Sequence, residues 1–201
     1  ADAFVINDVH KPLASLWRKI SNEPTALADG YEALWNAQQE RPRKFYDEVR
    51  DRFNESHEPA DFLYLLARCV KAAIRYNSKG EFNNSPDKRR LGMKPETMRA
   101  NLVAVSKLLK GKTKVTSLDY ADAIAEATKA DLVYMDPPYQ GVTNTHNHRF
   151  LEGLDIGRFI ETLADLNRRS VPFIISYDGR TGDKVHGQPL PASLRLTHAE
   201  V

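Results

Sequence analysis

Four consecutive residues, Asp136, Pro137, Pro138 and Tyr139, could together hold an amino group on a flat heterocycle. The prolines lack a backbone N–H and have a fixed φ, so the chain there is stiff and offers only hydrogen-bond acceptors. The Asp136 carboxylate and the Pro137 carbonyl can accept both hydrogens of an exocyclic amine. The Tyr139 ring offers a face for stacking, which contributes roughly 1–3 kcal/mol for a nucleobase. These residue types in this order predict a site for the amino group of a planar base.

The elements that must position this motif alternate between strand and helix along the chain. Apolar residues before Asp136 predict a short buried strand, and apolar residues at helical spacing predict helices between the strands. Strands are expected at residues 3–8, 113–120, 131–139 and 171–179, and helices at 9–22, 60–76, 94–111, 121–130 and 154–170. Residues 25–75 have little strand character, and residues 77–95, rich in Asn, Gly, Ser and Pro, predict an irregular loop or hairpin. The alternation predicts an α/β fold with a largely parallel sheet.

Polar residues end all four predicted strands. In open parallel sheets a ligand binds beyond the carboxyl ends of the strands. A row of carboxylates at such an edge is unfavourable unless ligand hydroxyls and amines meet them. Helix capping explains Asp122 and Asp155 well, but it explains Asp136 poorly because two prolines follow it. The residues expected at this edge are Asp8, Asp119, Tyr120, Asp136 to Tyr139, Ser176, Tyr177 and Asp178.

The charge of the chain is segregated, although the net charge is only +2. Residues 68–114 hold 13 Lys and Arg against Glu81, Asp87 and Glu96, so the remainder of the chain is acidic. A basic segment on an acidic body favours binding of a polyanion by that segment. A solvated surface charge is the alternative for each of these residues.

Length and composition predict an ordinary globular protein. The 201 residues, 41% of them hydrophobic, can bury a core, and we expect one domain with a smaller attached lobe. The single cysteine, Cys69, lies in an apolar run, so we expect core packing, no disulfide framework and a reducing cytoplasm. No stretch approaches the roughly 18–20 apolar residues of a membrane span, and residues 1–12 lack a signal-peptide pattern.

The DPPY motif at residues 136–139 resembles the catalytic motif of amino-group DNA methyltransferases that use S-adenosylmethionine. Four further stretches narrow the resemblance to the Dam-type N6-adenine-specific class: INDVHKPLASLW from residue 6, RYNSKGEFN from residue 75, SLDYADAI from residue 117 and LNRRSVPFIISYDGRTGDKVHG from residue 166. They are similar to the second cofactor strand, the DNA-recognition segment, the third motif and a later strand and loop. The resemblance implies a Rossmann-like methyltransferase sheet in residues 1–24 and 112–201, with a mainly helical, basic DNA-recognition insert in residues 25–111.

The resemblance also implies roles for the strand-end residues. Asp8 would accept the ribose hydroxyls of the S-adenosylmethionine cofactor, and Asp119 would meet the cofactor's adenine amine, with Tyr120 near that ring. Asp136 and the Pro137 carbonyl, backed by Pro138, would hold the target N6 amine, and Asp136 also counts among the cofactor-binding residues. Tyr139 would stack on an adenine rotated out of the duplex. No metal is implied.

The basic segment lies where this class contacts DNA. Arg and Asn side chains can make bidentate contacts to guanine and adenine edges, so base contacts are expected from Arg75, Asn77, Lys79, Asn83 and Asn84. Phosphate contacts are expected from Lys88, Arg89, Arg90 and Lys94. For Phe82 two interpretations stay open, core packing and a wedge near the extruded base. The expected partner is double-stranded DNA, and a restriction endonuclease counterpart is compatible with it. No association with a membrane is expected.

The sequence departs from the class in one respect. The glycine-rich cofactor loop should precede residue 4, and none of the ten glycines stands in a G-x-G pattern. The sequence resembles the middle and back of such an enzyme, so residues 1–201 alone are expected to bind the cofactor weakly and to be inactive. Other methyl acceptors stay open, namely cytosine N4, RNA or a glutamine amide, and so does a non-catalytic DNA-binding fragment or subunit.

His146 and His148 stand two apart in a polar stretch, which invites the hypothesis of a metal site. No third ligand follows at a suitable spacing, so we expect no metal there. Residues 140–149 are expected to form a loop that becomes ordered when DNA is bound.

Overall fold

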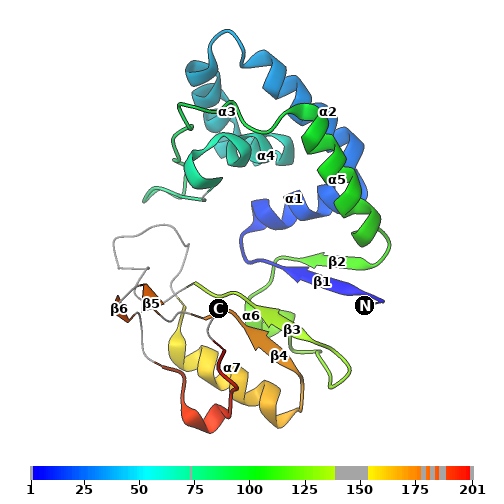
Figure 1. The fold of residues 1–201 in the computed structure, drawn as a ribbon, viewed down its shortest axis with the longest axis vertical. Coiled ribbons are helices and arrows are strands. Elements are labelled where there is room, and N and C mark those ends of the chain that lie inside the picture. Colours follow the sequence, from blue (N-terminus) through cyan, green and yellow to red (C-terminus); the bar gives the residue numbers. More distant parts are fainter. Residues whose placement is uncertain are drawn as a thin grey trace. The chain divides into compact units, whose positions relative to one another are not determined.

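The computed structural model describes residues 2–72, 74–138, 154–177, 180–181, 184–185 and 189–199. The chain forms two compact units, Ala1–Tyr120 and Ala121–Val201 (Figure 1). These units do not coincide with the predicted catalytic domain of residues 1–24 and 112–201 and the predicted insert of residues 25–111. That functional division of the chain stays a prediction.

The first unit is mainly helical. Its elements are β1 (Phe4–Asn7), α1 (Lys11–Asn22), α2 (Pro24–Ala37), α3 (Pro42–Ser56), α4 (Pro59–Arg68), the 3₁₀ turn η1 (Val70–Ala72), α5 (Pro95–Leu109), β2 (Thr113–Thr116) and the beginning of α6 (Tyr120–Ala123). A proline stands in the first turn of each helix from α1 to α5. The first N–H groups of a helix have no intrahelical partner, so proline loses no bond there and presets the helical φ.

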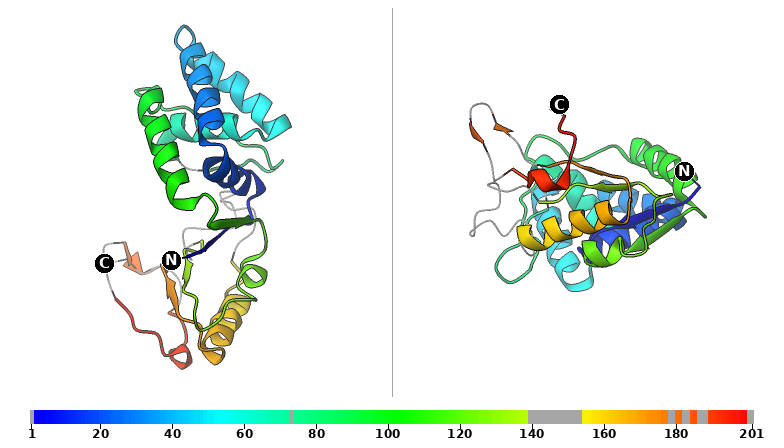
Figure 2. Two further views of the ribbon diagram at one scale, coloured as in Figure 1. Left: turned by 90° about the vertical axis from the view of Figure 1, so that its right-hand side faces the viewer. Right: turned by 90° about the horizontal axis from the view of Figure 1, so that it is seen from below.

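Strands β1 and β2 pair in parallel, with Phe4 opposite Thr113 and Asn7 opposite Thr116. Helix α1 follows β1 and α5 precedes β2, and α1, α2 and α5 pack on one another; Figure 2 shows α5 beside α2 from a second side. The buried Ser106 hydroxyl of α5 donates to the Ser21 carbonyl at the end of α1 (2.8 Å). This bond holds together the two helices that follow β1 and precede β2.

Aromatic rings fill the core of the first unit. Phe53 of α3 and Phe62 of α4 stack with centroids 4.9 Å apart, and Phe82 meets both rings edge-on at 5.9 and 6.2 Å. Each such pair stabilises the fold by about 0.5–1.5 kcal/mol beyond the burial of its area. Because Phe82 belongs to the irregular segment after α4, this cluster attaches that segment to the helices.

The second unit holds β3 (Val133–Met135), α7 (Ile156–Arg168), β4 (Phe173–Ile175), β5 (Arg180–Thr181), β6 (Lys184–Val185) and the 3₁₀ turn η2 (Ala192–Leu194). Strands β3 and β4 pair in parallel, and β5 and β6 pair antiparallel. The Asp155 carboxylate caps α7 by accepting a hydrogen bond from the Arg158 N–H (3.1 Å). The buried residues of α7 are spaced by three or four positions: Phe159, Leu163 and Leu166.

The helix predicted for residues 60–76 ends at Arg68, so its second half is wrong. Cys69 is extended and pairs with Pro86, and the Val70 N–H donates to the Ser85 carbonyl (3.1 Å). The returning chain therefore takes the place of the next helical turn. The predicted burial of Cys69 is confirmed.

The helix predicted for residues 121–130 is limited to α6, so its second half is also wrong. The Arg169 guanidinium donates to the carbonyls of Ile124, Ala125 and Ala127, at 3.2, 2.6 and 3.3 Å. A distant arginine thus satisfies carbonyls that would otherwise accept bonds within a longer helix.

The strand before Asp136 lies where it was predicted, but it is not buried as predicted. Leu132 is 64% exposed and Tyr134 is 65% exposed, whereas Val133 and Met135 are partly buried. Alternate residues of a strand point to opposite faces, so only one face of β3 is covered within its own unit. The chain as a whole is a mixed helix and strand fold with parallel strand pairs.

Candidate functional site

Asn7 ties together the ends of β1 and β2. Its Oδ1 accepts hydrogen bonds from the Thr116 hydroxyl (2.8 Å) and the Leu118 N–H (2.9 Å), and its Nδ2 donates to the Leu118 carbonyl (3.0 Å). These bonds turn the chain directly after β2. The structure thereby brings Asp119, and Tyr120 at the start of α6, to the same edge of this sheet as Asp8.

Asp8 also organises the start of α1. Its Oδ1 accepts a hydrogen bond from the His10 N–H (2.8 Å), and the His10 Nδ1 accepts one from the Leu13 N–H (3.2 Å) and so caps the helix. Burial lowers the pKa of the His10 imidazole, while Asp8 raises it and His57 lowers it further. A ring nitrogen that accepts a hydrogen bond carries no proton, so His10 is neutral with its proton on Nε2.

The ends of β3 and β4 form a sheet edge in the second unit. The Ser176 N–H, directly after β4, donates to the Met135 carbonyl at the end of β3 (2.9 Å). Asp136 follows as an exposed residue, and Pro137 and Pro138 are partly buried. Strand pairing therefore holds the backbone before Asp136, and two proline rings stiffen it afterwards.

Tyr177 lies against α7 rather than at an open edge, because its ring stacks on Phe159 with centroids 6.1 Å apart and an interplanar angle of 20°. This contact holds the chain after β4. Two residues predicted for this edge, Tyr139 and Asp178, lie outside the described residues. The same holds for His146 and His148 and for the predicted loop at residues 140–149.

Residues 76–82 form a short hairpin in the first unit, and Tyr76 and Phe82 face each other across it. The Asn77 Oδ1 accepts hydrogen bonds from the N–H groups of Lys79 (2.9 Å) and Glu81 (3.0 Å), and its Nδ2 donates to the Glu81 carboxylate (2.7 Å). Gly80 has a φ of +76°, which favours glycine. Both ends of the Asn77 amide are used within the turn, so the structure favours a role in shaping the hairpin over the predicted base contact.

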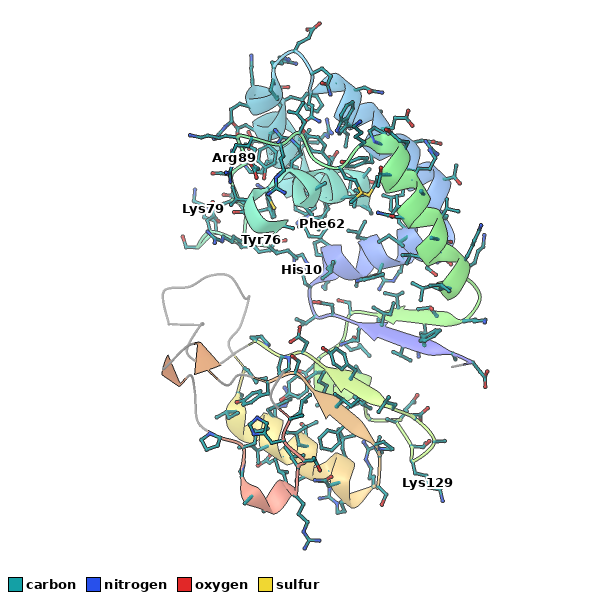
Figure 3. The ribbon with its side chains drawn as sticks, in the orientation of Figure 1. His10, Phe62, Tyr76, Lys79, Arg89 and Lys129 are labelled. Carbon is teal, nitrogen blue, oxygen red and sulfur yellow. The ribbon has the colours of Figure 1, made fainter. Side chains whose placement is uncertain are left out.

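Asn54 of α3 holds the second strand of the hairpin. Its Nδ2 donates to the Phe82 carbonyl (3.1 Å) and its Oδ1 accepts from the Phe82 N–H (2.7 Å). One side-chain amide thus satisfies both backbone groups of Phe82, as a neighbouring strand would. Lys79 is exposed in the turn and is drawn in Figure 3. Arg75, on the other strand, is partly buried.

Two predicted DNA contacts are corrected by burial. The Phe82 ring is 1% exposed and packs among aromatic side chains, so core packing replaces the wedge near an extruded base. Asn84 is also buried, and its carbonyl accepts a hydrogen bond from the Tyr46 hydroxyl (2.9 Å). Asn83 between them is exposed and stays available for contact with a ligand.

Residues 84–93, called the basic loop below, form no helix or strand, yet buried side chains from α2, α3, α4 and the C-cap of α2 hold their carbonyls. Tyr31 donates to Met93 (2.6 Å), Gln38 to Leu91 (2.9 Å), Tyr46 to Asn84 (2.9 Å), and Arg68 to Asp87 (3.1 Å) and to Arg90. Burial is the main cause that raises the pKa of Tyr31 to about 12, so its hydroxyl remains a donor at neutral pH. The irregular backbone of this loop is thereby fixed.

Asp87 anchors the exposed arginines of the basic loop. Its carboxylate accepts hydrogen bonds from the Arg89 N–H (2.8 Å) and the Arg90 Nε (3.2 Å). The backbone bond from Arg89, followed by the contacts with Arg90, lowers the pKa of the Asp87 carboxyl. The side chains of Arg89 and Arg90 are 89% and 78% exposed, and Lys88 is exposed beside them. Cations on a fixed backbone are suited to contact phosphates.

Sequence reasoning missed the residues that hold these surfaces. They are His10, Tyr31, Gln38, Asn54, Arg68 and Tyr76. A partial signal was present, because Tyr64 and Arg68 stand four residues apart within an apolar run, and Tyr64 donates to the buried Gln38 (3.0 Å). Polar residues on the apolar face of a helix need buried partners, but the sequence does not say which carbonyls those partners are.

Within the described residues, no group of three His, Cys, Asp or Glu side chains could hold a metal ion. No helix in this part of the chain is long and apolar enough to cross a membrane.

Comparisons with known proteins identify the family of the chain. The family model described as D12 class N6 adenine-specific DNA methyltransferase matches residues 1–196. A DNA N-6-adenine-methyltransferase from Escherichia phage P1 is 28% identical over 186 residues, covering 87% of this chain and 24% of that protein. The DNA adenine methylase of Escherichia coli is 26% identical over 182 residues, covering 86% and 64%.

A third relative, the type II methyltransferase M.MjaIII from Methanocaldococcus jannaschii, is 28% identical over 153 residues, which cover 70% of this chain and 52% of that protein. In each of these three comparisons the matched region spans less than two thirds of the relative.

Proposed function

The chain belongs to the D12 class N6 adenine-specific DNA methyltransferase family, and on that premise we propose that it takes part in methyl transfer from S-adenosylmethionine to the N6 amine of an adenine in duplex DNA. The proposal includes a Rossmann-like sheet and a mainly helical recognition insert. The observation that carries it is the Asp136-Pro137-Pro138 motif at the end of a strand that is paired in parallel.

The residues at the end of β1 and β2 fit an adenosine-containing cofactor. Asp8 uses one carboxylate oxygen to accept the His10 N–H, which leaves the other oxygen for a ribose hydroxyl. Asp119 lies at the same sheet edge and would accept the amine of the cofactor's adenine, with Tyr120 next to that ring. When bound, S-adenosylmethionine supplies an electrophilic methyl group.

The acceptors after β3 would act on the target amine. Asp136 and the Pro137 carbonyl would accept the two N6 hydrogens, and Pro138 would keep that pair in place. Positive charge develops on N6 as it gains a methyl group, so two oriented acceptors stabilise the transition state more than the ground state. Tyr139 would stack on the adenine, which must leave the duplex because its N6 is otherwise inaccessible.

Basic and polar side chains of the first unit would bind the DNA. Lys79, Arg75 and Asn83 in and beside the hairpin are the proposed base readers, and Lys88, Arg89 and Arg90 on the basic loop are the proposed phosphate contacts. A restriction endonuclease counterpart is part of the same proposal, since one relative is named a type II methyltransferase.

The test is methylation of duplex DNA by the full-length protein that carries these residues, followed by digestion to nucleosides and mass spectrometry. The expected product is N6-methyladenine. N4-methylcytosine, or transfer to RNA or to a glutamine amide, would keep the reaction and replace the substrate. DNA binding without any transfer, or without binding of cofactor, would favour a non-catalytic DNA-binding subunit.

A further inference from the structure

The hairpin of residues 76–82 is held at its base by two contacts that come from different parts of the first unit. On its first strand, Tyr76 Oη forms a hydrogen bond with His10 Nε2. On its second strand, Asn54 binds both backbone groups of Phe82. Figure 3 shows His10, Tyr76 and Phe62 together, with ring centroids 5.2 Å apart for His10 and Tyr76 and 5.6 Å for His10 and Phe62.

Only the contact through His10 leads back to the sheet edge of Asp8. The Asp8 carboxylate fixes the His10 backbone, and the Leu13 N–H fixes the orientation of the imidazole through Nδ1. The remaining proton on Nε2 points to the Tyr76 hydroxyl, which precedes the turn made by Asn77. Partly buried hydrogen bonds thus connect the proposed ribose-binding carboxylate to the proposed recognition hairpin, over a separation of 66 residues between His10 and Tyr76.

We propose that His10 and Tyr76 are positioning residues that couple occupancy of the cofactor site at Asp8 to the order of the DNA-contacting hairpin, an inference that rests on the proposed function. A ribose held by Asp8 fixes that carboxylate, and with it the His10 backbone and ring. The Tyr76 hydroxyl then binds a His10 ring whose position is fixed, so the hairpin loses less conformational freedom when it contacts DNA. By linkage, bound DNA raises the affinity for the cofactor by the same factor.

The coupling is measured as the ratio of the DNA dissociation constants without and with saturating S-adenosylhomocysteine, which occupies the cofactor site and transfers nothing. Fluorescence anisotropy of a labelled duplex on the full-length protein gives both constants. We expect a ratio of about 10 for the unchanged protein, within the usual range of about 5–150 for coupled sites. Tyr76→Phe keeps the ring and removes the hydroxyl, and it should lower the ratio to about 2 or less.

A second variant guards against a folding defect in Tyr76→Phe. His10→Asn keeps a good helix cap for α1 but is too short to reach Tyr76, so the same loss of coupling is expected. Asn54→Ala is the matched control, because it loosens the second strand of the hairpin, and the hydrogen bonds between Asn54 and Phe82 do not involve Asp8 or His10. It should weaken DNA binding with and without S-adenosylhomocysteine by the same factor.

The inference is overturned if the unchanged protein shows no coupling, if Tyr76→Phe and His10→Asn retain it, or if Asn54→Ala loses it equally. Failure of the proposed function looks different, since the unchanged protein would then form no N6-methyladenine whatever its coupling ratio.

Discussion

The basic loop of the first unit and the Asp136 motif of the second both hold exposed polar groups on irregular backbone, but by different means. The loop is held by buried side chains of the helical core, such as Gln38 and Arg68, which donate hydrogen bonds to its carbonyls. The motif is held along the chain, by strand pairing at Met135 and then by two prolines.

The difference predicts how each region tolerates change. Where the supporting side chains are buried, replacing one of them should disrupt the exposed loop even though no exposed residue is changed, because unsatisfied carbonyls are costly in the interior. Where the support is local, the exposed residue can be removed without loss of folding. Stability and function should therefore be linked in the basic loop and separate at Asp136.

The largest effect is expected at Asp136. Asp136→Ala removes one of two transition-state acceptors and should lower the turnover number for DNA methylation at least about 100-fold. The thermal midpoint should stay unchanged because the side chain is exposed.

Asp155→Ala is the control acid in the same unit. It removes the cap of α7, so it should cost about 1 kcal/mol of unfolding free energy and leave turnover intact. A large loss of stability in Asp136→Ala would break the separation of stability from function.

Arg68 should show the opposite behaviour. Arg68→Leu leaves the Asp87 and Arg90 carbonyls without their buried donor, and should lower the free energy of unfolding by about 2–4 kcal/mol in urea titrations. DNA affinity should fall as well, since the loop loses its shape. Arg89→Ala removes an exposed cation and should change stability by less than about 0.5 kcal/mol while weakening DNA binding. Unaltered DNA affinity in a destabilised Arg68→Leu protein would mean that the loop's shape is not needed for binding.

A smaller effect separates the hairpin from the basic loop. Lys79→Ala, or Arg75→Ala, should cost about 1–3 kcal/mol of binding to the preferred site and relax the choice of sequence. Lys88→Ala should weaken binding to all duplexes alike and make the salt dependence of binding shallower by about one unit. Anisotropy titrations at several salt concentrations, with preferred and altered duplexes, measure both quantities. Equal losses on both duplexes for all three variants would contradict the assignment of base reading to the hairpin.

The smallest effect concerns pH. Burial lowers the pKa of the folded His10 below its usual 6.5, so the unfolded chain takes up this proton at higher pH than the folded protein does. The free energy of unfolding that His10 contributes is fully present at pH values above its usual pKa of 6.5. This contribution is lost as the pH falls through 6.5 towards the lower pKa of the folded protein. Between about pH 7.5 and pH 6 the loss is at most about 0.8 kcal/mol. Urea titrations should show this decrease of the free energy of unfolding with falling pH in the unchanged protein and not in His10→Asn. The same slope in both proteins would assign it to other groups.

Much of the first unit could be predicted from the sequence, because its signals are local. Prolines 24, 42, 59 and 95 each stand at the first position of a helix, and apolar residues at helical spacing set the buried face of α1. The Asp136 motif is equally local, since its stiffness comes from two adjacent proline rings. The family resemblance rests on such short sequence motifs, and the match of the family model over residues 1–196 confirms it.

Tertiary structure alone decided the burial of Phe82, the end of α4 and the hydrogen bonds that hold the irregular segments. Nothing local in the sequence marks Phe82 as a core residue, because its burial depends on Phe53 and Phe62 from two other helices. The end of α4 at Arg68 depends on the return of Pro86 beside Cys69. Hydrogen bonds between groups 19 to 66 residues apart leave no periodic trace in a sequence, so the support of the basic loop and the contact of His10 with Tyr76 emerged only from the folded chain.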